Sequence, residues 1–126
     1  MMRHNFKNLK IWQEAMKMVR ETYALTKSFP DHERYVLANQ MTRSAVSIPS
    51  NIAEGTSKNS DKHINKFIQD SLGSAFEWET QLNIAYQQAC IDRDTFDKLE
   101  NKIQQLQKMI SGFRKRLQPK QSILDS

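Results

Sequence analysis

Glycine, proline and cysteine are scarce in this sequence of 126 residues, which contains three, three and one of them respectively. Many short strands need glycine and proline in their turns, so this scarcity argues against an all-β fold. The single cysteine, Cys90, has no partner for a disulfide within the chain. No apolar run approaches the roughly 18 residues that span a bilayer, and none follows the basic N-terminus as in a secretory signal. We therefore expect a cytoplasmic protein that does not contact membranes.

Apolar residues recur instead at alternating spacings of three and four, which is the period of a helix. The predicted helices cover about residues 8–28, 32–54, 60–89 and 93–117. Links of only a few residues join antiparallel neighbours, so the sequence predicts an all-α fold, an antiparallel up-down-up-down four-helix bundle. One domain covers residues 1–126, and we expect residues 1–5 and 119–126 to be flexible.

The same spacing predicts which residues face the core of the bundle. In the first helix the stripe is Leu9, Trp12, Met16, Val19, Tyr23 and Thr26. In the second it is Leu37, Ala38, Met41, Ala45, Ile48 and Ile52. In the third it is Ile64, Ile68, Ser71, Ala75, Trp78, Leu82, Ala85 and Ala89. In the fourth it is Phe96, Leu99, Ile103, Leu106, Ile110, Phe113 and Leu117. Asp31 is the predicted N-cap of the second helix, Ser60 or Asp61 caps the third, and Gly55 is predicted to adopt a left-handed conformation after the second.

Residue patterns for catalysis or metal binding are missing. No glutamate is followed three positions later by histidine, the pattern of metal-binding bundles, and the three histidines do not share a ligand spacing. Neither a glycine-rich phosphate loop nor a Gly-x-Ser-x-Gly turn occurs. Glu77 and Glu79 point to different sides of a helix because they are two residues apart. We predict no metal ion, no cofactor and no enzymatic activity.

The formal charge is +5, the isoelectric point is near 9.4, and basic residues gather near both ends of the chain. Such tracts attract phosphates or acidic partners, although a solvated helix surface has the same composition. The candidate nucleic-acid contacts are Lys108, Arg114, Lys115 and Arg116 in the last helix and Lys10 and Lys17 in the first.

The stretch RSAVSIPSNIAEG, residues 43–55, combines small polar residues with a proline inside a helix. A helical wheel places Arg43, Ser47, Ser50 and Glu54 together, opposite the apolar arc. Pro49 removes a backbone hydrogen bond at a cost of about 3 kcal/mol, so we expect a kink and a compensating side chain, from Ser44, Ser47 or Asn51. Val46, Pro49 and Ala53 form a small apolar flank for a close neighbour within the bundle or in another subunit.

Glu79 lies at the edge of the third apolar stripe, where a carboxylate needs a partner. We predict an ion pair with Arg43, buried or at an interface, because a guanidinium offers two parallel donors. The residues that we interpret as structural or interface residues are Arg43, Ser47, Pro49, Asn51, Glu54, Gly55 and Glu79.

Three segments carry a family resemblance: FKNLKIWQEA at 6–15, FPDHERYVLANQMTRSAVSIPSNIAEG at 29–55 and GSAFEWETQL at 73–82. With them, residues 6–117 resemble the four-helix-bundle proteins encoded in intervening sequences of bacterial 23S rRNA genes. The resemblance implies a small cytosolic bundle that forms a ring-like homopentamer and has no enzymatic activity. It also implies kinship with basic pentameric accessory proteins of diversity-generating retroelements, which are thought to bind nucleic acid and a reverse transcriptase.

The chain departs from the family pattern at two places. The usual Arg-Arg pair is Thr42-Arg43, which weakens phosphate binding by that face. The leucines around the Gly-Ser motif are Ala75 and Trp78, so we expect Trp78 to alter packing. The favoured function is an oligomeric accessory protein that binds RNA or DNA, and the alternative is a scaffold for a protein partner.

Overall fold

The structure is a computed structural model that describes residues 5–117, apart from two side chains in a short helix. Its elements are the 3-10 helix η2 (Phe6–Asn8) and the α-helices α1 (Lys10–Thr26), α2 (Asp31–Arg34), α3 (Leu37–Thr56), α4 (Asp61–Gln87) and α5 (Arg93–Leu117). Within residues 5–117 there is no strand. Flexibility was predicted for residues 1–5 and 119–126, and all of these except Asn5 lie outside the described part of the chain.

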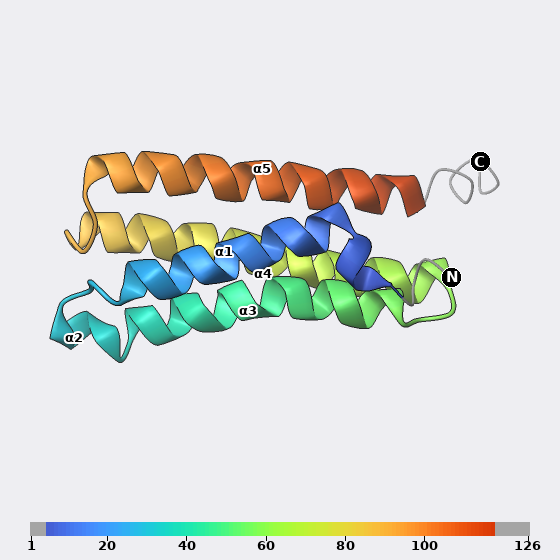
Figure 1. Ribbon diagram of the computed structural model, residues 1–126, viewed down its shortest axis with the longest axis horizontal. Helices are drawn as coiled ribbons and strands as arrows, with labels where there is room; N and C mark the ends of the chain where they lie inside the picture. The colour runs from blue at the N-terminus through green and yellow to red at the C-terminus, as the bar shows by residue number, and fades with distance from the viewer. Residues whose placement is uncertain (1–4, 118–126) are drawn as a thin grey trace.

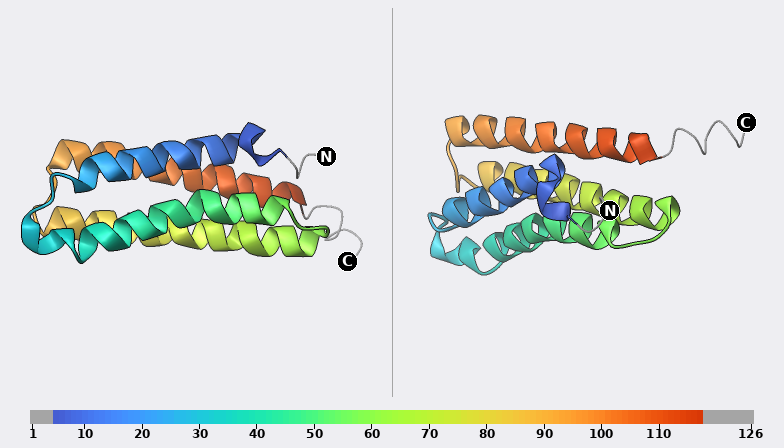
Figure 2. Two further views of the ribbon diagram at one scale, coloured as in Figure 1. Left: turned by 60° about the horizontal axis from the view of Figure 1, so that its bottom comes forward. Right: turned by 45° about the vertical axis from the view of Figure 1, so that its right-hand side comes forward.

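The four long helices form the predicted antiparallel bundle, so the fold class is confirmed (Figure 1). Each helix has two neighbours, in the order α1, α3, α4, α5 and back to α1. Figure 2 shows α1 beside α5 and α3 beside α4. The α3–α4 pair makes the most extensive contact and the α1–α5 pair the least.

The second predicted helix is interrupted. A single turn, α2, ends at Arg34, and α3 begins at Leu37 after Tyr35 and Val36. Phe29 and Leu37, on either side of this region, are both buried, and the interruption lets the chain place both in the core. The predicted cap is also wrong, because Asp31 lies inside α2 and Pro30 precedes that helix without a side-chain cap.

The core stripe of α3 agrees with the prediction at all six positions, but the stripe of α1 does not. The buried residues of α1 are Ile11, Ala15, Met18, Thr22 and Thr26. Leu9, Trp12 and Val19 are only partly buried, and Tyr23 is 50% exposed. The reason is a polar bond in the core: Trp78 Nε1 in α4 donates to Thr22 Oγ1 over 3.0 Å. Thr22 therefore faces inward, and the stripe is rotated by one residue.

The stripes of α4 and α5 are largely confirmed. The predicted residues that are buried are Ile68, Ser71, Ala75, Trp78, Leu82 and Ala85 in α4 and Phe96, Leu99, Ile103, Leu106 and Ile110 in α5. Ile64, Phe113 and Leu117 are partly buried at the same end of the bundle, and Ala89 is exposed after the end of α4. Trp78 lies fully inside the core, so this departure from the family pattern is one of core packing.

Gly55 does not have the conformation predicted for it. It is a buried residue of α3 with a negative φ, and α3 continues to Thr56. A Cβ atom at Gly55 would lie 2.9 Å from Phe67 Cβ and 3.4 Å from the Ile64 carbonyl oxygen. Glycine is therefore needed here because α4 approaches so closely, and the end of α3 sets the spacing of the α3–α4 pair.

Side-chain caps begin both α4 and α5. Ser60 Oγ accepts a hydrogen bond from the backbone N–H of His63 over 3.3 Å, as predicted for this position. Asp92 Oδ1 accepts one from the backbone N–H of Thr95 over 2.8 Å, and this bond lowers the pKa of the Asp92 carboxyl. Both caps satisfy backbone donors that the first turn of a helix leaves unpaired.

Ala89 ends α4 in a strained conformation, with φ at 61°. An L residue with a side chain pays about 1–2 kcal/mol for this region, whereas glycine adopts it readily. We expect Ala89→Gly to raise the free energy of unfolding by about 1 kcal/mol in urea denaturation. Gln88 has a φ of −87°, so Gln88→Gly is the matched control and should give no gain. If both variants change the free energy of unfolding equally, the backbone of Ala89 is not strained.

Candidate nucleic-acid interface

The start of α1, the end of α3, the start of α4 and the end of α5 lie at one end of the bundle (Figure 1). This follows from the alternating directions of four antiparallel helices. The basic tracts near the two ends of the sequence are thereby brought together. We call this half of the molecule the basic end and define it as residues 5–18, 47–74 and 106–117.

The basic end carries ten Lys and Arg residues against four Asp and Glu residues. The cations are Lys7, Lys10, Lys17, Lys58, Lys62, Lys66, Lys108, Arg114, Lys115 and Arg116, and the acids are Glu14, Glu54, Asp61 and Asp70. The rest of the described chain carries seven basic and nine acidic residues. The formal charge is thus +6 in one half of the bundle and −2 in the other.

The last turn of α5 holds three of the predicted contact residues. Lys115 and Arg116 are exposed, and the Arg116 guanidinium lies 5.9 Å from the centre of the Phe113 ring. Arg114 is half-buried, and its Nε atom is buried without a hydrogen-bond partner among the described residues. Two exposed cations on a helix end are accessible to a phosphate group, and they also interact favourably with the helix dipole.

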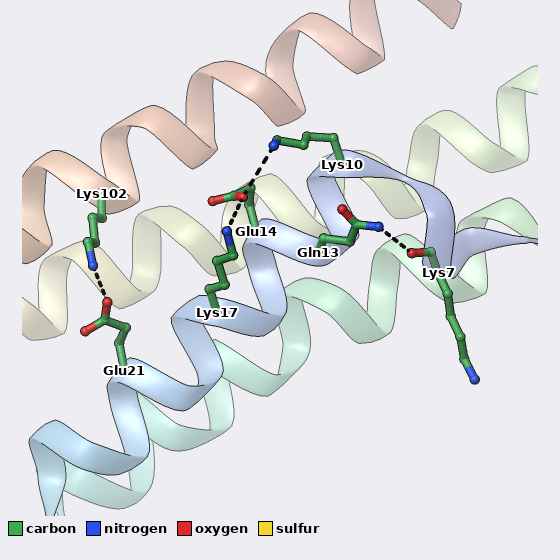
Figure 3. A network of polar contacts seen from close by, with 7 residues as sticks. All are labelled: Lys7, Lys10, Gln13, Glu14, Lys17, Glu21 and Lys102. Atoms are coloured by element: carbon green, nitrogen blue, oxygen red, sulfur yellow. Dashed lines mark hydrogen bonds and ion pairs between the residues drawn. The ribbon is translucent and has the colours of Figure 1, made fainter.

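Two other predicted contacts, Lys10 and Lys17, share one carboxylate. Their Nζ atoms lie 3.8 Å and 3.0 Å from Glu14 Oε2 (Figure 3). Both lysines are well exposed, and exposed ion pairs contribute little free energy, so a phosphate can displace Glu14 at small cost. Lys10 and Lys17 are nevertheless weaker candidates than Lys115, for which no ion pair is found among residues 5–117.

A further ion pair links α5 to α1, the neighbouring long helices with the least extensive contact. Lys102 Nζ donates to Glu21 Oε2 across the two helices (Figure 3). A cavity of about 240 Å³ lies beside this pair, over Met18, Leu106 and Met109. The pair holds α1 and α5 together across the cavity, so Lys102 has a structural role and is less available to an external anion.

Four lysines of the basic end were not among the contacts predicted from the sequence: Lys7, Lys58, Lys62 and Lys66. The Nζ atoms of Lys58 and Lys66 each lie 5.0 Å from the centre of the Phe67 ring, and Lys66 also pairs with Asp70 over 3.2 Å. Lys62 is exposed in the first turn of α4. A cation is unfavourable in the first turn of a helix, so the position of Lys62 was a signal available in the sequence.

Comparison with known proteins identifies the family. The model of the 23S rRNA-intervening sequence protein family matches residues 7–112. The chain belongs to the 23S rRNA-intervening sequence protein family. A comparison with curated proteins gave no match. One similar solved structure is that of a protein with unknown function from the S23 ribosomal protein family of Bacteroides thetaiotaomicron. It is 21% identical, with a TM-score of 0.78 over 83% of this chain and 98% of the other, and it supports the fold.

In this 23S rRNA-intervening sequence protein, the motif at 43–55 packs α3 against α4 through hydroxyl groups. Ser44 Oγ donates to Gln81 Oε1 over 2.7 Å, and Ser74 Oγ donates to Ser47 Oγ over 2.9 Å. Ser71 Oγ donates to the Ile48 carbonyl oxygen over 2.8 Å. Small side chains let the two helices approach, and each hydroxyl finds a partner. The motif is therefore a helix-packing motif within the family fold.

The predicted pairing of Arg43 with Glu79 is not formed within the chain. Arg43 is exposed on α3, while both carboxylate oxygens of Glu79 accept hydrogen bonds from α5. Gln107 Nε2 donates to Oε1 over 2.8 Å, and Gln104 Nε2 donates to Oε2 over 2.9 Å. Glu79 lies on the side of α4 that faces α5, away from α3. Two amide donors satisfy the half-buried carboxylate in place of the guanidinium.

Pro49 is buried, and α3 continues through it as one α-helix. Two side chains bond to carbonyl groups next to the missing hydrogen bond: Asn51 Nδ2 donates to the Ser47 oxygen over 2.9 Å, and Ser50 Oγ donates to the Val46 oxygen over 2.8 Å. Asn51 was a predicted compensating residue. Val46 is 39% exposed and Ala53 is half-buried, so the small flank is only partly covered by the chain itself, and Glu54 is exposed beyond it.

Across residues 5–117, no three His, Cys, Asp or Glu side chains are grouped closely enough to hold a metal ion. In the same part of the chain, no helix has the length and apolar character needed to cross a membrane.

Proposed function

We propose that this protein is a non-enzymatic, oligomeric accessory protein that binds the phosphate backbone of RNA or DNA through its basic end. The observation that carries the proposal is the separation of charge along the bundle, +6 against −2. A field of one sign over one end of a small protein attracts a polyanion and orients it on approach.

Oligomerisation would strengthen this binding. One chain carries a formal charge of +5, and five copies, the number that the family resemblance implies, would carry about +25. Phosphate contacts give affinity that depends steeply on salt and little on sequence. Base-specific recognition is not part of this proposal.

A protein-binding scaffold is the second candidate function. It is favoured by two exposed apolar side chains between α2 and α3: Tyr35 is 80% exposed and Val36 is 59% exposed. They lie at the end of the bundle opposite the basic end. A partner bound there would leave the basic end accessible, so the two candidate functions are tested separately.

The basic end is tested with the double variant Lys115→Gln and Arg116→Gln. Loss of two phosphate contacts should weaken binding of an RNA duplex by roughly tenfold at low salt. It should also reduce the slope of the logarithm of the binding constant against the logarithm of the salt concentration by about two. Fluorescence anisotropy titrations at several salt concentrations measure both quantities.

The matched control is the double variant Arg20→Gln and Lys98→Gln, which removes the same charge from exposed residues in the other half of the bundle. We expect the control to change the affinity by less than about threefold at an ionic strength of about 0.1 M, where the Debye length is about 10 Å and exposed charges further away are largely screened. If both double variants lose the same affinity for the RNA duplex, binding depends on the net charge of the protein and not on the basic end. Light scattering verifies that the wild-type protein is an oligomer. If this oligomer does not bind RNA at low salt, the proposal of nucleic-acid binding is overturned and the protein-binding scaffold remains.

A further inference from the structure

A groove of about 480 Å³ runs between α4 and α5 on the surface of the bundle. One wall comes from α4, with Leu72, Phe76 and Glu79, and the other from α5, with Gln104, Lys108 and Ser111. Phe76 is 52% exposed, although it is one of the largest apolar side chains of the protein. The groove is therefore lined by an exposed aromatic ring, that of Phe76, and by the side chain of Lys108.

Basic residues continue along both walls towards the basic end. On α4, Lys62 lies on the same side of the helix as Leu72 and Phe76, because steps of three and four residues connect them. On α5, steps of four, three and four connect Gln104, Lys108, Ser111 and Lys115. Lys62, Lys108 and Lys115 are exposed, and the two on α5 are about 10 Å apart along the helix axis.

Among the described residues, Glu79 is the single acid that lines the groove, and it lies away from the basic residues. Glu79 is at the end of the groove further from Lys62 and Lys115, and both its oxygens accept hydrogen bonds from Gln104 and Gln107. Its charge is therefore partly compensated. The groove has an apolar and aromatic centre, cations towards the basic end and a carboxylate at the opposite end.

We infer that this groove binds single-stranded nucleic acid, with an unpaired base stacked on the Phe76 ring and the adjoining phosphates at Lys108, Lys115 and Lys62. The inference rests on the proposed function and specifies where and in which form the nucleic acid binds. Stacking on an aromatic side chain beside a positively charged track is the usual way in which proteins bind single strands without sequence preference. Bases in a duplex are covered by their neighbours and do not offer a face to Phe76.

Charge complementarity favours this occupant over a second copy of the chain. A second copy that placed its own basic end along the groove would bring like charges to both walls, which opposes its approach in that orientation. A nucleic acid strand supplies regularly spaced negative charges together with flat apolar rings. It matches both features of the groove at once.

The test compares Phe76→Ala with Tyr23→Ala, an aromatic side chain of nearly equal exposure, 50%, on α1 outside the groove. Anisotropy measures binding of a uridine 20-mer and of an RNA duplex of the same length at one low salt concentration. We expect Phe76→Ala to weaken binding of the single strand by roughly tenfold with little effect on the duplex. Tyr23→Ala should leave both affinities within twofold. Ultraviolet cross-linking of the wild type should attach the single strand to residues 72–79.

The possible results separate the two proposals. If the wild type binds both nucleic acids and the two alanine variants behave alike, the groove assignment is wrong and binding by the basic end stands. If the wild type binds neither, the proposed function fails and the groove assignment fails with it. If Phe76→Ala changes the oligomeric state in sedimentation, the groove is a subunit interface and the assignment is overturned.

Discussion

Replacement of Trp78 by alanine should lower the free energy of unfolding by about 3–5 kcal/mol, measured by urea denaturation. Trp78 is fully buried at the centre of α4, between residues of the other long helices. The loss combines the transfer free energy of the indole ring with the cavity that remains, because surrounding helices close only in part. It is a large share of the 5–15 kcal/mol that holds a typical domain folded.

Two further variants keep this prediction testable if Trp78→Ala does not fold. Thr22→Val removes the hydroxyl that accepts from Trp78 Nε1 and leaves a buried N–H without a partner, so we expect a loss of about 1–3 kcal/mol. Phe76→Ala alters an aromatic residue on the same helix that is 52% exposed, and its cost should stay under about 1 kcal/mol. Equal costs at positions 76 and 78 would show that burial does not control stability here.

Replacement of Gly55 by alanine should cost about 1–3 kcal/mol, because the added methyl group has no room between α3 and α4. The contact at 2.9 Å is with Phe67 Cβ, an atom fixed to the backbone of α4, so it cannot be relieved by rotation of a side chain. The helices must separate, which also strains the hydroxyl pairs nearby. Urea denaturation gives the free energy of unfolding of the variant.

The same substitution at Gly73 should have the opposite sign. Gly73 is an exposed residue of α4, and a Cβ atom there would meet nothing within 4 Å. Alanine has the higher helix propensity, so Gly73→Ala should stabilise the protein by about 0.5–1 kcal/mol. Stabilisation by both substitutions would refute the close approach of α3 and α4 at Gly55.

Periodicity predicted the bundle because each long helix buries one stripe. It was sufficient for α3, whose apolar residues form a single arc. It failed for α1, where Trp12, Val19 and Tyr23 form one plausible stripe and Ile11, Met18 and Thr22 form another. The choice depends on Trp78, 56 positions further along the chain from Thr22, which needs a hydroxyl partner in the core. A local pattern contains no information about that bond.

For the candidate site too, the sequence predicted what depends on single segments and did not predict what depends on how distant segments pack together. Counting charges identified Lys108, Lys115 and Arg116, and all three are exposed. The lysines of the α3–α4 link and the start of α4 were missed because only the direction of the helices brings them to the same end. The pair of Arg43 and Glu79 is not formed within the chain because Glu79 faces α5, and the register between α4 and α5 could not be derived from the spacing within either helix.

The separation of charge between the two halves of the bundle gives the protein a permanent electric dipole along its long axis. The 27 residues of α4 extend over roughly 40 Å, so the opposite charges are well separated for a chain of this size. A torque then acts on the molecule in the field of any polyanion and turns the basic end towards it before contact. The protein should therefore approach a polyanion end-on, with the link between α4 and α5 pointing away into solution.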